Sequence, residues 1–146
     1  ALKYPDNRAV IDLYASHLIL GGNSERAMAL DYLRRHLSDA TTVPEDYIYV
    51  MQLELFLERE DLLFEDLTTA LELYPTDFSI LSFAGFMYGQ YGFHREAIKM
   101  FETCLEIADS DYDRRNLKCS IKARCVFIAF NFIFKFSNEI FGELLI

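Results

Sequence analysis

The sequence predicts an all-α protein built from pairs of amphipathic helices. Apolar residues recur at the i, i+3, i+4, i+7 spacing of one helix face, beginning with Ile11, Tyr14, Ala15 and Leu18. Residues that end helices recur at intervals of 34, 36 and 34 along the chain, at Pro5, Asp39, Pro75 and Asp109. A near-constant interval of this length indicates a helix pair that repeats.

The composition is that of a folded protein able to bury a sizeable core. Of the 146 residues, about one domain in length, 52% are apolar and 15% are aromatic. Disordered chains are poor in both kinds of residue. The net charge of -9 argues against a nucleic-acid binder, which usually carries a basic patch. It favours basic or neutral partners, and it also keeps a protein soluble.

Neither the cysteines nor the apolar runs indicate a disulfide framework, a metal site or a membrane span. Cys104, Cys119 and Cys125 are odd in number and form no close ligand pair of the C-x₂-C kind. We therefore expect three reduced and mostly buried thiols. The longest dense apolar run, 125–136, contains Asn131 and Lys135 and is well short of the ~20 residues that a spanning helix needs.

Helix-breaking and helix-capping residues divide the chain into units. Residues 1–6 are expected to be the tail of a preceding repeat, and 7–111 to hold three helix pairs. Asn23 or Ser24 is expected to cap the second helix of the first pair, after the break at Gly21 and Gly22.

The second helix pair, at about 44–75, shows its own start signals. Pro44 suits the first position of a helix, and the acidic residues Glu45 and Asp46 favour the same end. Asp61 is expected to cap the second helix of this pair.

The third pair, 78–111, carries a recognisable pattern. Its two helices join at Gly92, and five residues fall in the order and spacing of the tetratricopeptide repeat (TPR), which the stretch resembles: Gly85, Tyr88, Gly92, Ala97 and Phe101. The resemblance implies a right-handed α-solenoid of antiparallel helix pairs. It also places Ala97 at a close helix crossing with Gly85.

The first two pairs depart from the family pattern at three positions. Asp31 stands where a large apolar residue is usual, and Arg34 where a small one is usual. Glu54 stands where the family often has a packing tyrosine. We expect Asp31 and Arg34 to be accommodated beside a surface.

The last stretch, 112–146, matches the pattern least. It is locally basic over 114–124 and then apolar nearly all round over 125–136. We expect a degenerate or truncated fourth pair, or a C-terminal apolar helix, with Ser137 or Asn138 capping a last short helix. The alternation of Phe132, Phe134 and Phe136 would also suit a strand.

No pattern of catalytic, cofactor-binding or metal-ligating residues emerges. His17, His36 and His94 are widely spread and lack a local catalytic signature, so we do not expect an enzyme. The acidic run 109–113 invites a calcium interpretation. A calcium loop would require Gly and Glu where this chain has Arg114 and Ser120. A helix end followed by a helix cap explains the run better.

The TPR resemblance implies a peptide-binding groove lined by the first helix of each pair. Carried onto this chain, the lining is Asp12, Ser16, Tyr49, Gln52, Phe56, Phe83, Phe86 and Gln90. No Lys or Arg stands at the matching positions, which argues against the mode that clamps a terminal carboxylate. The aromatic residues are of the kind enriched at binding hot spots. We expect a protein or peptide partner that is apolar with some basic character; the alternative is that these aromatics pack inside.

A second hypothesis is a structural unit that self-associates or packs against another part of a larger protein. The apolar stretch 125–136 needs cover, and a second copy of the chain would supply it through Phe127, Phe130, Phe134 and Phe141. The alternative cover is the chain's own groove. Both hypotheses leave the cellular location open between the cytoplasm and a bacterial envelope.

Overall fold

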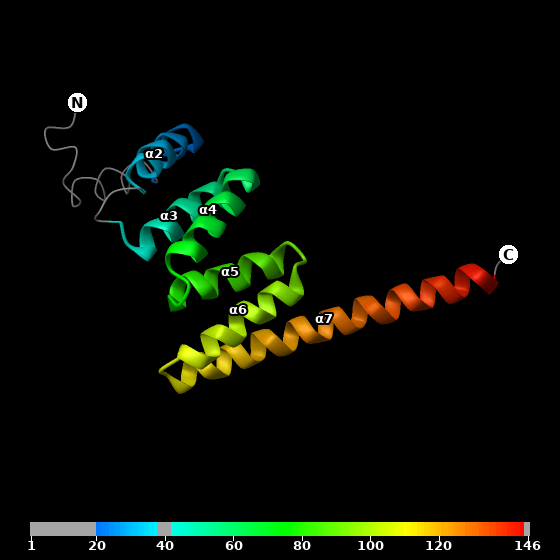
Figure 1. Ribbon diagram of the computed structural model, residues 1–146. Coiled ribbons are helices and arrows are strands. Elements are labelled where there is room, and N and C mark those ends of the chain that lie inside the picture. The colour runs from blue at the N-terminus through cyan, green and yellow to red at the C-terminus, as the bar shows by residue number, and fades with distance from the viewer. Residues whose placement is uncertain (1–19, 38–41, 145–146) are drawn as a thin grey trace, which may run out of the picture. The chain divides into compact units, whose positions relative to one another are not determined.

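The protein is all-helical wherever its structure is described. The computed structural model describes residues 20–37 and 42–144, with side chains for 20–37 and 42–131 (Figure 1). Within these ranges the helices are α2 (Asn23–His36), α3 (Pro44–Phe56), α4 (Glu60–Leu73), α5 (Phe78–Gln90), α6 (His94–Ile107) and α7 (Asp111–Leu144). The all-α prediction is confirmed for this part of the chain. The tail at 1–6 and the expected first helix lie outside the described residues.

The chain divides into two compact units, residues 1–75 and 76–146. In the first unit, α3 packs against both α2 and α4. The contact between α2 and α3 is an apolar cluster of Ala29, Leu30, Val50 and Leu53. Leu33, Leu37 and Leu57 pack around it. These residues bury one stripe of each helix, which is how an amphipathic helix gains most of its stability.

The helix starts of the first unit agree with the sequence only in part. Pro44 is the first residue of α3, as predicted, and the Asp46 carboxylate accepts a hydrogen bond of 2.8 Å from the Val43 N–H. The predicted caps of α2 and α4 are wrong. The residues before these helices are Gly22 and Arg59, and neither helix has a side-chain cap. Asn23, Ser24 and Asp61 already lie inside the helices.

In the second unit, α6 packs against both α5 and α7. Asp77 caps α5 by accepting a hydrogen bond of 3.0 Å from the Ile80 N–H. Ala97 and Gly85 are buried, as a close crossing requires. The nearest atoms to a Cβ on Gly85 would be those of the Phe101 ring, at 2.6 Å, so Gly85 makes room for that ring.

A constant shift in chain position relates α3 and α4 to α5 and α6. The helix starts move by the same interval, from Pro44 to Phe78 and from Glu60 to His94, and the paired helices have equal lengths. This interval is 34 residues, the same as the interval between Pro5 and Asp39 in the sequence.

The turns inside the two pairs correspond as well. Glu58 and Gly92, related by the same interval, both have positive φ, 57° and 85°. The next N–H reaches back to the helix in both turns, from Arg59 to the Glu54 carbonyl and from Phe93 to the Tyr88 carbonyl, each at 2.8 Å. The correspondence thus extends from the helices to the backbone geometry that joins them.

The last helix, α7, is a single continuous element of 34 residues. The Ser110 hydroxyl oxygen caps it by accepting from the Asp113 N–H at 3.0 Å, which confirms a helix cap in the acidic run. The expected helix break near Ser137 and Asn138 is wrong, as is the strand alternative. The physical reason is that no proline occurs in 111–146 and the only glycine there is Gly142.

Candidate functional site

The residues predicted to line a groove on α3 share one exposed side of that helix. Tyr49, Gln52 and Phe56 follow the i, i+3, i+7 spacing, and all three are exposed, with Tyr49 at 44% and Phe56 at 56%. The Arg26 guanidinium of α2 lies 4.0 Å from the centre of the Phe56 ring, a cation–π contact that leaves more than half of Phe56 accessible.

The same three positions recur on α5, shifted by the interval that relates the two helix pairs. Phe86 is 49% exposed and Gln90 is exposed, whereas Phe83 is half-buried. The first set belongs to the first unit and the second set to the second unit, so each is a surface of its own unit. A groove that joins them stays a prediction. Asp12 and Ser16 lie outside the described residues.

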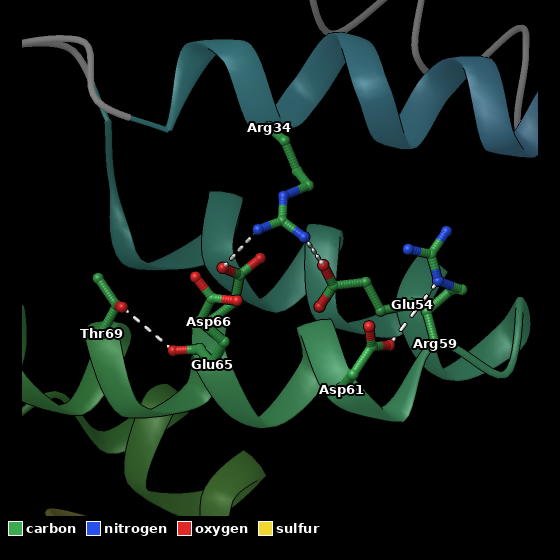
Figure 2. Close-up of polar contacts among 7 residues, drawn as sticks. All are labelled: Arg34, Glu54, Arg59, Asp61, Glu65, Asp66 and Thr69. Carbon is green, nitrogen blue, oxygen red and sulfur yellow. Dashed lines mark hydrogen bonds and ion pairs between the residues drawn. The ribbon is translucent and has the colours of Figure 1, made fainter.

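A cluster of three charged side chains lies between the helices of the first unit (Figure 2). Arg34 of α2 reaches toward α3 and α4, and its guanidinium pairs with a carboxylate of each helix. Its Nη1 lies 3.0 Å from Glu54 Oε1 and its Nη2 lies 3.2 Å from Asp66 Oδ1. Glu54 is fully buried and Asp66 is 6% exposed. One side chain therefore links all three described helices of the unit.

The two carboxyls of this cluster are electrostatically unusual. Burial raises the pKa of Glu54 to about 8, and the neighbouring Asp66 acts in the same direction, because it favours a protonated Glu54 that can donate to it and disfavours a second negative charge. Burial also raises the pKa of Asp66, against the lowering effects of Glu54 and Arg34. Glu54 Oε2 and Asp66 Oδ2 are buried without a hydrogen-bond partner among the described residues when both groups are ionised. A proton held by one carboxyl would let it donate to the other.

The cluster is arranged to hold helices together. A buried carboxyl pair with a raised pKa also occurs in active sites. Here Glu54 has no exposed surface through which a substrate would reach it. Arg34 borders two open hollows of the first unit, of about 710 Å³ and 510 Å³; Asp66 borders the second of them, and Glu54 borders neither. When the two carboxyls share one proton, the guanidinium and the remaining negative charge leave the cluster without net charge.

The apolar stripe of α4 contains a sequence signal for this cluster, namely an aspartate among its buried residues. Leu63, Leu67 and Ala70 are buried on α4, and Asp66 completes their i, i+3, i+4, i+7 pattern. A carboxylate in the middle of an apolar stripe requires a partner. Arg34 and Glu54, two of the three departures from the repeat pattern, are that partner and its neighbour. The sequence singled out both but did not bring them together.

The histidines and cysteines do not gather into one site. His36 Nδ1 lies 2.8 Å from the Tyr32 carbonyl, and the His94 ring lies 4.4 Å from the ring of Phe127. Over 20–37 and 42–131, no three His, Cys, Asp or Glu side chains are grouped to hold a metal ion.

Two of the three thiols are exposed rather than buried. Cys104 is buried, but Cys119 and Cys125 are exposed, so the expectation of mostly buried thiols is wrong for two of the three. The reason is that both lie on sides of α7 that α6 does not cover.

The surface of α7 has two sides of different character. Toward α6, Leu117 is buried and Ile121 and Ile128 are half-buried. On the same side, Arg124 Nη1 donates to the carbonyl of Gly89 in α5 at 3.1 Å. On the opposite side, Cys119, Ala123, Val126 and Phe130 are exposed. Val126 is 68% exposed and Phe130 64%. Phe127 lies between the two sides, and the side chains of Phe134 and Phe141 lie outside the described residues.

No family model matches this chain, and no curated protein matches its sequence at a significant level. Among the described residues, no helix is both long and apolar enough to cross a membrane. The class that the structure defines is an all-helical protein in which two successive helix pairs correspond at one constant interval along the chain.

Proposed function

We propose that this chain is a non-enzymatic interaction module of the TPR kind. Its helix pairs would stack as a right-handed solenoid and hold a segment of a partner protein against the first helix of each pair. The observation that supports this function is the exposure of aromatic residues among the three corresponding positions of each first helix, Tyr49 and Phe56 on α3 and Phe86 on α5. Large exposed apolar side chains beside polar ones are typical of protein-binding surfaces.

The partner segment is proposed to be apolar with some basic residues. The exposed aromatics supply apolar contact, and the neighbouring Gln52 and Gln90 supply amide groups for backbone hydrogen bonds. The net charge of -9 attracts basic segments and repels acidic ones. Since such attraction between exposed charges is screened by ions, binding should weaken as salt rises.

A panel of fluorescent peptides tests this function with the full chain. Peptides that alternate apolar and basic residues should bind, and acidic peptides of equal apolar content should not. Phe86→Ala should weaken binding by about ten-fold, a loss typical of an aromatic hot spot, at an unchanged melting temperature. Tyr112→Ala, which removes an exposed aromatic at the start of α7, is the control and should have no effect. Binding confined to acidic peptides, or indifferent to Phe86→Ala, would contradict the proposal.

Structural self-association is the second candidate function. It is favoured by the exposure of Val126, Phe127 and Phe130 on one helix, since exposed apolar side chains in series mark an interaction surface. The occupant of that surface would be a second copy of the chain. Sedimentation velocity of the intact chain across a range of concentrations tests this function directly.

A further inference from the structure

Two lines of residues run along α7 with alternating steps of three and four. The inner line, on the side that contacts α6, begins Leu117, Ile121, Arg124, Ile128. The outer line begins Cys119, Ala123, Val126, Phe130, all of them exposed. The same steps continue through the sequence of this unbroken helix, to Asn131, Lys135, Asn138 and Gly142 for the inner line and to Ile133, Ser137, Ile140 and Leu144 for the outer line.

The polarity of the inner line changes along α7. Its first half contains three aliphatic residues that are buried or half-buried, and its second half contains no aliphatic residue. The helix continues well past α6, as Figure 1 shows within this unit: α7 has 34 residues and α6 has 14. The polar half of the inner line begins beyond Phe127, whose ring contacts that of His94, the first residue of α6. The sequence thus gives the stretch 125–136 a polar side, at Asn131 and Lys135.

The outer line has the spacing of a coiled-coil seam. Alternating steps of three and four residues give a mean repeat of about 3.5, which keeps one stripe facing a partner helix. The seam from Cys119 to Leu144 covers about 37 Å of helix. The partner that fits this seam is a helix with the same spacing, and α7 of a second copy provides one.

The charges beside the seam distinguish between parallel and antiparallel pairing of two α7 helices. Arg115, Lys118 and Lys122 are exposed at its beginning, whereas Glu139 and Glu143 occur near its end. Lys122 precedes the seam residue Ala123, and Glu143 precedes Leu144, so both flank the seam on the same side. A parallel pair would gather the basic side chains of both copies at one end. An antiparallel pair would set each basic end beside the acidic end of the other copy.

We infer that two copies of this chain associate through an antiparallel pairing of α7, centred between Phe130 and Ile133. In this register Lys122 of each copy lies beside Glu143 of the other, Val126 faces Ser137, and Ala123 faces Ile140. The inference rests on the proposed self-association and adds its direction and register. It does not depend on the peptide-binding surface, which lies on other helices.

The first experiment measures the dimer dissociation constant of the full chain by sedimentation. Val126→Glu should raise that constant about ten-fold or more, because it sets a charge into the seam of both copies. Asn131→Glu introduces the same charge on the inner line, at another exposed position, and should leave the constant unchanged. Circular dichroism should show full helix content in both variants. A chain that is monomeric at all concentrations would overturn the self-association and the register together.

The second experiment tests direction and register alone. Lys122→Glu and Glu143→Lys should each weaken the dimer about five-fold, and the double variant should restore it, because two symmetric ion pairs are lost and regained. In a Cys125→Ser background, copper–phenanthroline should not link Cys119 to Cys119, since antiparallel pairing separates them by about 37 Å. A dimer that Val126→Glu weakens, but that cross-links at Cys119 and is not restored by the double exchange, would keep the self-association and overturn the antiparallel register. A dimer indifferent to Val126→Glu would overturn the pairing through α7 and with it the register.

Discussion

Glu58 and Gly92 adopt the same left-handed backbone conformation at equivalent turns of the two helix pairs. Each follows the first helix of a pair, and each allows the next N–H to bond back to the last helical turn. Glycine adopts this conformation without steric cost, whereas a residue with a Cβ is strained by roughly 1–2 kcal/mol. The turn after α3 therefore has the backbone conformation of the turn after α5, but a glutamate occupies the position at which glycine is favoured.

Glu58→Gly is expected to raise the free energy of unfolding by about 0.5–1 kcal/mol. The relief of strain in the folded state exceeds the entropy that a glycine adds to the unfolded chain. Urea denaturation should show a higher midpoint at an unchanged slope. The converse change, Gly92→Ala, meets no atom within 4 Å, so its expected loss of about 1 kcal/mol is purely conformational. A lower midpoint for Glu58→Gly would show that the Glu58 side chain stabilises the turn.

Glu54→Gln is expected to flatten the dependence of stability on pH. The pKa of Glu54 is raised to about 8 in the folded protein, so the folded state binds more protons than the unfolded state between its ordinary pKa of 4.5 and about pH 8. The free energy of unfolding must then fall as pH rises through this window. A glutamine remains neutral and can donate a hydrogen bond to Asp66.

The measurement for Glu54→Gln is chemical denaturation at pH 5, 7 and 8.5. The variant should be more stable than the unmodified protein at pH 8.5, by on the order of 2 kcal/mol, with a smaller difference at pH 5. Glu72→Gln, an exposed glutamate of the neighbouring helix α4, is the matched control and should leave the profile as it is. Parallel profiles for Glu54→Gln and the unmodified protein would mean that Glu54 is ionised throughout.

Arg34→Met is expected to lower the free energy of unfolding at pH 7 by about 2–4 kcal/mol. Methionine keeps the aliphatic contact but leaves two buried carboxyls without a cation. The loss lies below that of a fully buried pair because the Arg34 side chain is 26% exposed. The loss should shrink as the pH falls, because protonation of Asp66 removes the remaining buried negative charge. Arg35→Met, in which the neighbouring arginine is 75% exposed and 4.0 Å from Asp31, should cost less than about 0.5 kcal/mol. Equal losses for Arg34→Met and Arg35→Met would contradict a structural role for the cluster.

Gly85→Ala and Gly89→Ala should differ although both lie inside α5. A Cβ on Gly85 would meet the buried Phe101 ring at 2.6 Å, whereas a Cβ on Gly89 would meet the end of the Arg124 side chain at 2.5 Å. Overpacking costs roughly 1–3 kcal/mol, and alanine gains about 1 kcal/mol in helix propensity. Since an arginine end moves aside and a buried ring does not, we expect a net loss of about 1 kcal/mol for Gly85→Ala and little change for Gly89→Ala. Thermal unfolding of both variants makes the comparison, and equal shifts would show that the ring yields as easily as the arginine.

What the sequence predicted well depends on local chemistry. Pro44 at a helix start, Gly92 at a turn and the repeat interval from α3 to α5 follow from residues close together in the chain. The caps of α2 and α4 were missed because backbone groups, with Gly22 and Arg59 before the helices, begin those elements without a side-chain acceptor. The single helix at 111–144 was missed because polar residues at Ser137 and Asn138 resemble a cap when their neighbours are unknown.

The charged cluster could not be predicted as a unit from periodicity. Arg34 lies 20 residues from Glu54 and 32 residues from Asp66 in the sequence. Only the packing of α3 against α2 and α4 brings the three side chains together. Each looks like an isolated exception when its own helix is considered alone. The groove residues are a different case. Tyr49, Phe56 and Phe86 are exposed as a binding surface requires, and their use by a partner stays a prediction.

The buried cluster also constrains how this sequence can evolve. Replacing all three charged residues by well-packed apolar ones would cost little, because desolvation already offsets much of what the ion pairs contribute. Any first step along that route removes one member and strands a charge among buried side chains, as Arg34→Met would. Intermediate sequences on this route are therefore less stable than both its start and its end, by the cost of the unpaired buried charge. Descendant lineages should keep Arg34, Glu54 and Asp66 together or lose them together, and a lineage with a tyrosine at position 54 should have changed position 34 as well.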